Sequence, residues 1–292
     1  MEHENLKSKI MLIISMVIFG TIGIFRKHIP LSSSMLAMSR GFIGSIFLLV
    51  YISIKGQKIS FESIKRNLIT LLITGCCLGF NWILLFEAYE YTTVATATLC
   101  YYLAPIFVIM VSPILFKEKM NLKKAICVLV ALIGMVFVSG VVTSGFNGIS
   151  ELKGVLLGVS AAVLYATVVI LNKRTKDIDA YERTIIQLFT AAIVLAPYNL
   201  VNESISFTNL LPITIFMLIL VGIIHTGIAY ALYFSSMKGL KAQTIALYSY
   251  IDPIVAILLS TLLLHEPMSI FEVIGAIMIL SATMISELTS SN

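Results

Sequence analysis

One stretch of the sequence occurs twice, 148 residues apart. Residues 102–120 read YLAPIFVIMVSPILFKEKM and residues 250–268 read YIDPIVAILLSTLLLHEPM, with 8 identities in 19 positions aligned without a gap. The same offset pairs further identical residues: Gly79 with Gly227, Phe86 with Phe234, Thr96 with Thr244, and Leu99 with Leu247. This similarity indicates a duplicated unit and divides the chain into two repeats, residues 1–147 and 148–292.

The composition is that of an integral membrane protein. Hydrophobic residues make up 59% of the 292 residues and charged residues 12%, against about 25% charged in soluble domains. Apolar runs of about 20 residues, the length that crosses a bilayer, follow one another with short polar turns between them. The sequence therefore predicts an all-α membrane protein with ten transmembrane helices, at residues 10–25, 34–54, 67–87, 92–116, 122–142, 152–171, 183–201, 212–234, 242–264 and 270–286.

The distribution of basic residues predicts the orientation in the membrane. With these helices, 15 Lys and Arg residues fall in the loops and tail of one side and 3 on the other. Cytoplasmic loops carry such an excess. We therefore expect a multi-pass protein of the cell membrane, bacterial inner or plasma membrane, with both termini in the cytoplasm. The net charge of +5 has this origin, and a nucleic-acid partner is not expected.

Five helices per repeat have a topological consequence. If the first repeat begins on the cytoplasmic side, the second must begin on the opposite side, so the two repeats are inverted. Inverted repeats are typical of secondary transporters, whose substrate site lies near the membrane midplane between the repeats. Because one chain holds both repeats, a monomer would suffice, and a dimer is left open.

Two longer segments carry a family resemblance. EAYEYTTVATATLCYYLAPIFVIMVSPILFKEKM and YFSSMKGLKAQTIALYSYIDPIVAILLSTLLLHEPM, together with a basic residue in MSRGF, resemble the EamA-type transporters of the drug/metabolite transporter superfamily. The resemblance implies a ten-helix fold with cytoplasmic ends and a central cavity, in most members a bacterial exporter of small metabolites such as amino acids. Some members are importers, including importers of choline-like amines, so transport of an organic cation is the alternative.

Asp252 is a first candidate site residue, because an ionisable group in mid-membrane marks a functional site by default. It directly precedes Pro253, which removes one helical hydrogen bond and exposes a backbone carbonyl, and Tyr248 lies one turn earlier. Asp252 could bind a substrate amine or carry a coupling proton. It could also be neutralised by a hydrogen bond or by pairing with Arg40.

Arg40 is the second ionisable candidate, about seven residues into its predicted helix. Its guanidinium could hold a substrate carboxylate, for which its fork of donors is suited. Alternatively the long side chain could reach the membrane surface and serve a structural or gating role.

Aromatic residues recur at helical spacing in both repeats. Trp82, Phe86 and Tyr89 form one stripe, and Tyr230 and Phe234 occupy the positions of Trp82 and Phe86 in the second repeat. Such faces could line a cavity and hold an ammonium group by cation–π contact, or they could pack among helices.

Other polar residues complete the candidates. His225 is a possible proton carrier, since its unperturbed pKa is near 6.5, and a buried, neutral histidine is the alternative. The remaining polar groups at suitable depth are Asn81, Tyr101, Tyr102 and Tyr250, while Glu87 and Glu90 suit an entrance and Glu118 and Glu266 suit turns. No catalytic, phosphate-binding or metal-ligand motif is found, so we expect neither an enzyme nor a cofactor.

Overall fold

A computed structural model describes residues 2–115, 122–138, 149–172, 174–202, 211–237, 240, 248–249 and 251–290. Within these residues every regular element is a helix. Six helices are long and apolar enough to cross a membrane: Leu6–His28, Ser33–Ile54, Phe61–Tyr91, Glu151–Asn172, Ala180–Val201 and Pro212–Ser236. Four shorter apolar helices accompany them: Val94–Val108, Ala125–Val138, Ile251–Leu263 and Ile270–Ala282. The prediction of an all-α, multi-pass membrane protein is confirmed, and the count of ten spans stays a prediction.

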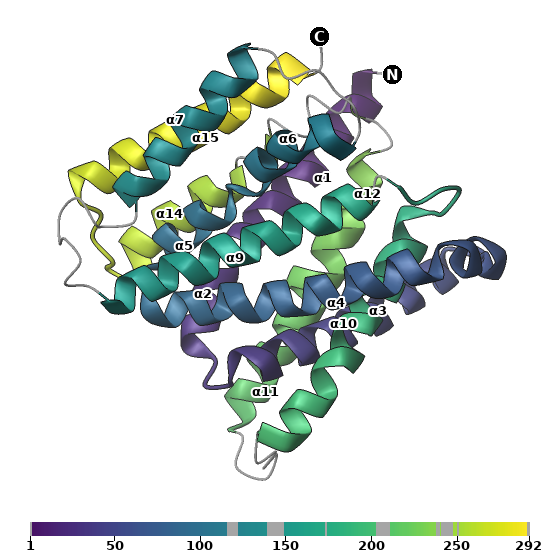
Figure 1. Ribbon diagram of the computed structural model, residues 1–292. Coiled ribbons are helices and arrows are strands. Elements are labelled where there is room, and N and C mark those ends of the chain that lie inside the picture. Colours follow the sequence, from purple (N-terminus) through teal and green to yellow (C-terminus); the bar gives the residue numbers. More distant parts are fainter. Residues whose placement is uncertain are drawn as a thin grey trace.

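The first predicted repeat contains seven described helices (Figure 1). They are α1 (Glu2–Gly20), α2 (Ile22–His28), α3 (Ser33–Ile54), α4 (Phe61–Tyr91), α5 (Val94–Tyr101), α6 (Ala104–Leu115) and α7 (Leu122–Val138). The starts of α3, α4 and α5 are capped by side chains that accept a hydrogen bond from a backbone N–H in the first turn: Ser32, Ser60 and Thr93.

The second predicted repeat contains the other described helices. They are α9 (Ile149–Asn172), α10 (Ala180–Asn202), α11 (Pro212–Leu220), the π-helix η3 (Val221–Ile228), α12 (Ala229–Met237), α14 (Ile251–Leu263) and α15 (Ile270–Ser290). Glu272 accepts from the backbone N–H of Ser269, whose hydroxyl accepts from Glu272 N–H, which is a capping box at the start of α15. Tyr250, Glu118, Thr244 and Leu247 lie outside the described residues.

Two predicted continuous helices are interrupted in the structure. The helix predicted at 92–116 ends as α5 at Tyr101 and resumes as α6 at Ala104. Pro105 has no N–H to donate to the carbonyl of Tyr101, four residues earlier, so the helix breaks there. The helix predicted at 10–25 is likewise interrupted at Thr21, between α1 and α2. The helix predicted at 212–234 contains the π-helical turns of η3.

Helix α9 packs antiparallel to α4. Near one end Lys153 lies over the ring of Tyr91, and in the middle Asn81 donates to the carbonyl of Ala161. Helix α1 packs antiparallel to α12 and η3 in the same way, with Phe19 against Tyr230. Contacts between the two halves of the chain therefore build most of the bundle.

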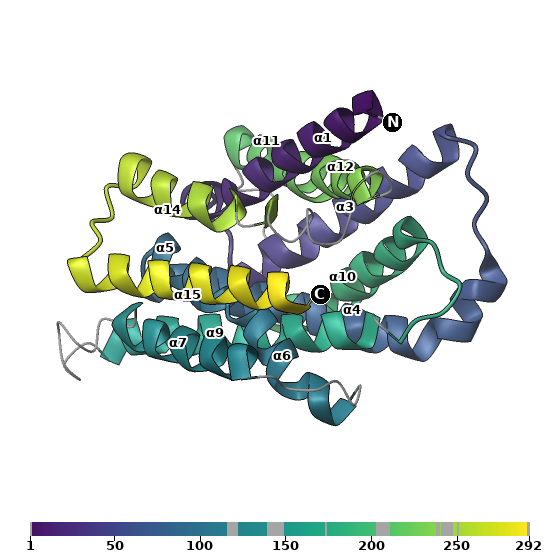
Figure 2. The same cartoon turned by 90° about the horizontal axis from the view of Figure 1, so that it is seen from above.

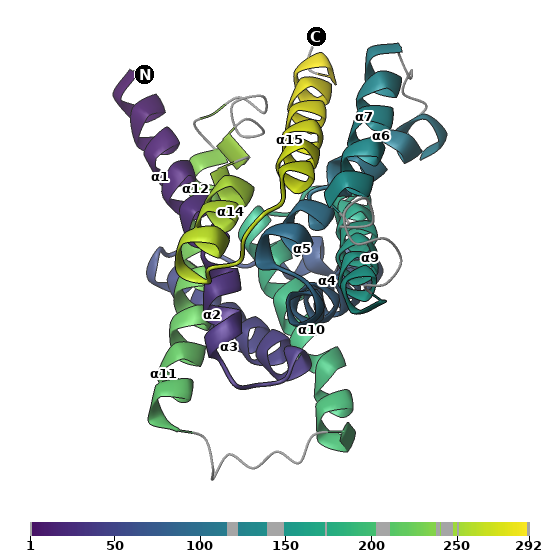
Figure 3. The same ribbon diagram turned by 90° about the vertical axis from the view of Figure 1, so that its left-hand side faces the viewer.

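Two further antiparallel pairs join segments that the sequence repeat relates. Helix α3 packs on α10, and α7 lies beside α15, where the backbones approach closely at Gly134 and Gly275 (Figures 1 and 2). When 148 is added to the residue numbers of α3 and α7, the resulting ranges begin within a few residues of the starts of α10 and α15. Helix α1 starts and α15 ends at the same end of the bundle, opposite the start of α11 (Figure 3).

Candidate functional site

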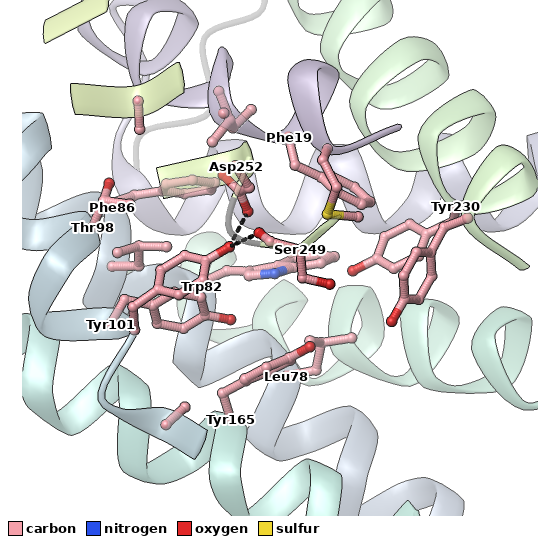
Figure 4. A pocket seen from close by; sticks show the side chains of 18 of the residues that line it. Phe19, Leu78, Trp82, Phe86, Thr98, Tyr101, Tyr165, Tyr230, Ser249 and Asp252 are labelled. Atoms are coloured by element: carbon pink, nitrogen blue, oxygen red, sulfur yellow. Dashed lines mark hydrogen bonds between the residues drawn. The ribbon is translucent and has the colours of Figure 1, made fainter. Parts of the chain in front are cut away.

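A cavity of about 430 Å³ lies where the two halves of the chain meet. Its walls come from α1, the start of α2, α3, α4, α5, α6, α9, α12 and α14. Eight residues singled out in the sequence line it, namely Arg40, Trp82, Phe86, Tyr89, Tyr101, Tyr102, Tyr230 and Asp252. Figure 4 labels five of these eight around one space, with Trp82 between Tyr101 and Tyr230.

Many of the lining positions are related by the repeat. Five pairs of lining residues stand 148 residues apart: Trp82 and Tyr230, Leu85 and Tyr233, Tyr101 and Ser249, Ala104 and Asp252, and Val108 and Ala256. The two halves thus contribute equivalent surfaces to the cavity. The residues at these paired positions differ, so the surfaces are chemically unequal.

Arg40 is buried inside the bundle. Only 5% of the residue is exposed, its Nε donates to the hydroxyl of Thr226 at 3.1 Å, and its guanidinium carbon lies 4.3 Å from the ring centroid of Trp82 and 5.4 Å from that of Phe86. Cation–π attraction and one hydrogen bond hold the guanidinium from two sides. Among the described residues its terminal amino groups form no hydrogen bond, and the residue lines the cavity.

The π-helix η3 supplies the polar partner of Arg40. π-Helical turns are rare and frequently mark functional sites. Thr226 of η3 turns toward Arg40 of α3, while its neighbour His225 turns toward α1, where Nε2 lies 2.7 Å from the hydroxyl of Thr21 and the ring contacts Phe25. Adjacent residues of η3 therefore bind two different helices.

Asp252 lies in the first turn of α14, facing the break between α5 and α6. The hydroxyl of Tyr102 lies 2.8 Å from Asp252 Oδ2 and 3.2 Å from the carbonyl oxygen of Ser249 (dashed in Figure 4). Pro253 cannot donate to the carbonyl of Ser249, four residues earlier, which leaves this oxygen available to Tyr102. The expected exposed carbonyl is thus present, and a side chain of the other half of the chain reaches it.

Asp252 and Arg40 do not form an ion pair with each other. The alternative in which Arg40 neutralises Asp252 is therefore not what the structure contains. Among the described residues neither has an ion-pair partner. They are also the only charged side chains among the described residues that line the cavity.

Three predicted site residues do not line the cavity. Asn81 is fully buried, and its side-chain amide N–H donates to α9. Its side-chain oxygen Oδ1 has no hydrogen-bond partner among the described residues. His225 lies behind the cavity wall against Thr21, and its Nδ1 has no partner among the described residues. Tyr248 lies before the start of α14 and is absent from the described lining.

The acidic residues near the helix ends have structural contacts. Glu87 accepts from the hydroxyl of Ser33, and Glu90 pairs with Arg26 at 3.1 Å. Glu266 accepts from the Ser260 hydroxyl at 2.6 Å and from the Val94 N–H at 2.9 Å, and it lies 3.6 Å from Lys27 Nζ. The expectation that Glu266 is a turn residue agrees with these contacts.

Several lining residues were missed by the sequence analysis. Of these, Tyr233 could have been found, because the repeat pairs it with Leu85 on the aromatic helix. Tyr165, Phe19 and Thr98 also line the cavity. Tyr165 and Phe19 have Val17 and Thr167 at their repeat positions, so neither has an aromatic counterpart that would single it out.

Comparisons with known proteins identify relatives over most of the chain. The EamA-like transporter family matches twice, over residues 6–140 and 152–287. The uncharacterized transporter YxxF of Bacillus subtilis is 32% identical over 272 residues, which cover 92% of this chain and 86% of that protein. An uncharacterized transporter of Archaeoglobus fulgidus is 25% identical over 278 residues, 94% of each chain.

A mammalian protein and a solved structure are also similar. Mouse solute carrier family 35 member G1 is 32% identical over 134 residues, 43% of this chain and 36% of that protein. A crystal structure, described only as that of a protein, aligns with a TM-score of 0.68 at 16% identity over 98% of this chain and 99% of the other. At that identity the likeness concerns the fold alone.

Proposed function

Because this chain belongs to the EamA-like transporter family, we propose that it is a secondary active transporter that moves a small polar metabolite by alternating access around the central cavity. The chain carries no nucleotide-binding motif in its sequence, so an ion gradient or the solute gradient would drive it. The partners that we propose for the protein are the lipid bilayer, the solute and a coupling proton. One chain suffices for it, since both halves contribute to one cavity.

The proposed solute is an amino acid or a related zwitterionic metabolite. One observation carries this choice: Arg40 of the first half and Asp252 of the second half line the same cavity without pairing with each other. A buried charge is costly unless it is partnered. A carboxylate at Arg40 and an ammonium group at Asp252 would partner both charges at once.

We propose that alternating access uses two inverted repeats, residues 1–147 and 148–292. The antiparallel packing of α9 on α4 and of α12 on α1 supports this arrangement. The five lining pairs at an offset of 148 residues support a site between the repeats.

We also propose export from the cytoplasm, with both termini on the cytoplasmic side. The excess of basic residues in alternate loops supports the orientation. The resemblance to metabolite exporters supports the direction. Uptake into inside-out vesicles, measured against right-side-out vesicles, tests the direction.

Transport of an organic cation is the second candidate. It is favoured by the ring-rich wall near Asp252, to which Tyr101, Tyr102, Tyr165 and Tyr230 contribute. Tyrosine faces and a carboxylate are the groups that bind quaternary ammonium ions. In this case Arg40 would have no role in binding the solute.

A ligand screen on the purified full-length protein tests both candidates. A ligand bound only by the folded state raises the thermal midpoint, by about 2.7 kcal/mol of stabilisation at 100 times its Kd. The probes are L-amino acids, choline and other quaternary amines, nucleosides and sugars. The proposal expects stabilisation by an amino acid that is lost in both Arg40→Gln and Asp252→Asn.

The outcomes separate the candidates. Stabilisation by choline or another amine that is lost only in Asp252→Asn supports the organic-cation transporter. A matched control is Lys153→Gln, which removes a cation from the Tyr91 ring outside the cavity, 3.8 Å from its centroid, and should leave ligand binding unchanged. Stabilisation by nucleosides or sugars alone would contradict both candidates.

A further inference from the structure

Two neighbouring residues of the π-helix η3 are bonded to different parts of the cavity wall. Thr226 accepts a hydrogen bond from Nε of Arg40 at 3.1 Å. The side chain of His225 points elsewhere, and its Nε2 lies 2.7 Å from the hydroxyl of Thr21. Thr21 stands at the interruption between α1 and α2, directly after the cavity-lining Gly20. One short element thus connects the cation of the cavity with the break in α1.

The break in α1 in turn supports the first turn of α14. A Cβ atom on Gly20 would lie 2.6 Å from the carbonyl oxygen of Asp252 and 2.7 Å from Cβ of Val255. The backbone of α1 therefore touches α14 directly, which a glycine permits because it has no side chain. A displacement of the α1 break must move the turn that carries Asp252.

The hydrogen-bonding protons around Thr21 fix the tautomer of His225. The Thr21 hydroxyl has one proton, which it donates to the carbonyl of Ile18 at 2.7 Å. Its oxygen is therefore the acceptor in the contact with His225, and Nε2 of His225 carries the proton that is donated. The opposite assignment would leave the contact with Ile18 without a hydrogen and would bury an Nδ1–H group that has no acceptor among the described residues.

The ring of His225 is also held from the side of α2. Its centroid lies 4.8 Å from that of Phe25, with the two planes 67° apart, which is an edge-to-face contact. Phe25 lies one turn beyond Thr21 along the chain. With 2% of the residue exposed, His225 is enclosed between η3 and the start of α2. Its hydrogen bond to Thr21 is therefore shielded from water.

Close packing fixes η3 against α3 on its other side. A Cβ atom on Gly44 would clash with the methyl group of Thr226, and one on Gly222 would lie 2.6 Å from Cβ of Ile43. Small residues at such crossings let two helix backbones approach closely. Sliding of η3 along α3 would drive these groups into one another. His225 and Thr226 therefore hold α3 and the break in α1 in one relation.

We infer that His225 is a positioning residue that fixes the spacing between the Arg40 guanidinium and the Asp252 carboxyl group. It is absent from the described lining of the cavity and acts through its neighbour Thr226 and through Thr21. With the spacing fixed, the protein selects solutes by the distance between their carboxylate and their ammonium group. This selectivity rests on the proposed function, whereas the spacing itself does not.

Distances between spin labels in the solute-free, full-length protein test the spacing. The labels are attached to Ile46→Cys of α3 and Ile254→Cys of α14, two exposed positions, after the four native cysteines have been replaced by alanine. Pulsed electron paramagnetic resonance in nanodiscs then measures the distance distribution between α3 and α14. His225→Leu removes the donor and Thr21→Val removes the acceptor, and each should shift or broaden this distribution.

Conservative variants separate the hydrogen bond from a merely structural effect. His225→Gln keeps a donor near the position of Nε2, and Thr21→Ser keeps the acceptor, so both should retain the wild-type distribution. His28→Gln is the matched control, because His28 is exposed and its Nδ1 contacts the Ile24 carbonyl of its own helix. An unchanged distribution in both His225→Leu and Thr21→Val overturns the positioning role. A change in Thr21→Ser as large as that in Thr21→Val overturns it as well.

Nitrogen NMR of the protein labelled with ¹⁵N-histidine tests the bond itself. The ring signal that disappears in His225→Gln should show a proton on Nε2 and none on Nδ1 at neutral pH. The Nε2 signal should shift in Thr21→Val and should stay in place in Thr21→Ser. A proton on Nδ1 alone would reverse the direction of the bond and overturn the role of Nε2 as donor.

A series of zwitterions tests the selectivity. Glycine, β-alanine and γ-aminobutyrate carry the same two charged groups with successively more methylene groups between them. Titration of Trp82 fluorescence gives the Kd of each, and the wild type should favour one member. The ratios between the three Kd values should change about three- to tenfold in His225→Leu and Thr21→Val, and they should be kept in His225→Gln and Thr21→Ser. A uniform rise of all three Kd values would contradict the selectivity.

The positioning role and the proposed cargo can fail separately. If no zwitterion binds the wild type, the amino-acid cargo is refuted, and the spin-label distances still decide whether His225 fixes the spacing. If a zwitterion binds but the distances and the Kd ratios are the same in His225→Leu, Thr21→Val and the wild type, the cargo stands and the positioning role is overturned.

Discussion

The guanidinium carbon of Arg40 lies 4.3 Å from the ring centroid of Trp82, the only tryptophan of the chain. An indole ring under a guanidinium is a natural fluorescence reporter of that cation. Any solute that binds Arg40 must therefore change the surroundings of a single fluorophore, whose signal has no background from a second tryptophan.

Replacement of Arg40 by Gln should abolish the change in Trp82 fluorescence that accompanies binding of a carboxylate ligand. The variant removes a charge that would donate to a carboxylate, an interaction worth about 1.5–3 kcal/mol, or roughly 10- to 150-fold in Kd. Titration of Trp82 fluorescence with the amino acid found in the screen measures the loss. Lys153→Gln serves as the control outside the cavity. Equal affinity of Arg40→Gln and wild type would remove the carboxylate from the proposed site.

Thr226 is expected to set the position of Arg40. Its hydroxyl accepts from Arg40 Nε, and the residue is fully buried in η3. Thr226→Val keeps the shape and removes the acceptor, and the guanidinium should then shift over Trp82. We expect Kd for the carboxylate ligand to rise about tenfold, with a change in ligand-free Trp82 fluorescence. Thr226→Ser should restore both values, which a purely steric role of the threonine methyl would not do.

Gly20→Ala should destabilise the contact between α1 and α14. A Cβ atom there would lie 2.6 Å from the carbonyl oxygen of Asp252 and 2.7 Å from Cβ of Val255. Such overpacking costs about 1–3 kcal/mol and should lower the apparent thermal midpoint in detergent. Gly79→Ala is the comparison, since its nearest neighbour would lie 3.2 Å away, and its effect should be smaller. A larger effect at Gly79 would show that the contact between α1 and α14 at Gly20 is not tight.

Two substitutions of Glu266 should lower the free energy of unfolding by different amounts. Glu266→Gln keeps an oxygen for the Val94 N–H and the Ser260 hydroxyl and loses only the partly exposed pair with Lys27, worth about 0–1 kcal/mol. Glu266→Ala leaves both donors without this acceptor, at about 1–3 kcal/mol. Thermal midpoints and amide exchange in the first turn of α5 measure the two effects. Equal losses in both variants would assign the stabilisation to the ion pair.

Apolar runs were sufficient to predict the helices but not their interruptions. The helix predicted at 34–54 is observed at Ser33–Ile54, where a serine cap and a long apolar run both mark the element. The interruption at Tyr102 is explained by Pro105, but its extent depends on which donors reach the backbone carbonyl that Pro105 leaves without its helical partner. The π-turns of η3 contain no proline, and hydropathy alone does not distinguish them from an α-helix.

The candidate site was predictable where the repeat or a charge singled out a residue. Arg40 and Asp252 stood out as charges in apolar helices, and Trp82 and Tyr230 as aligned aromatic residues, and all four line the cavity. His225 also stood out, yet it lies behind the wall, because periodicity does not give the rotation of a helix that changes pitch. The partners Thr226 and Ser249 depend on tertiary contacts between halves and could not be read from either repeat.

The pairing of Ala104 with Asp252 has a consequence for the electrostatics of the cavity. A symmetric dimer of one repeat would place every charge there twice, with two guanidinium groups and two carboxylates facing the same solute. In the fused chain Leu188 stands at the repeat position of Arg40 and Ala104 at that of Asp252, so one cation and one anion remain. With Asp252 ionised the formal charge of the described lining is zero, so the lining as a whole offers a cation at one place and an anion at another, which suits a solute that carries both charges and no net charge.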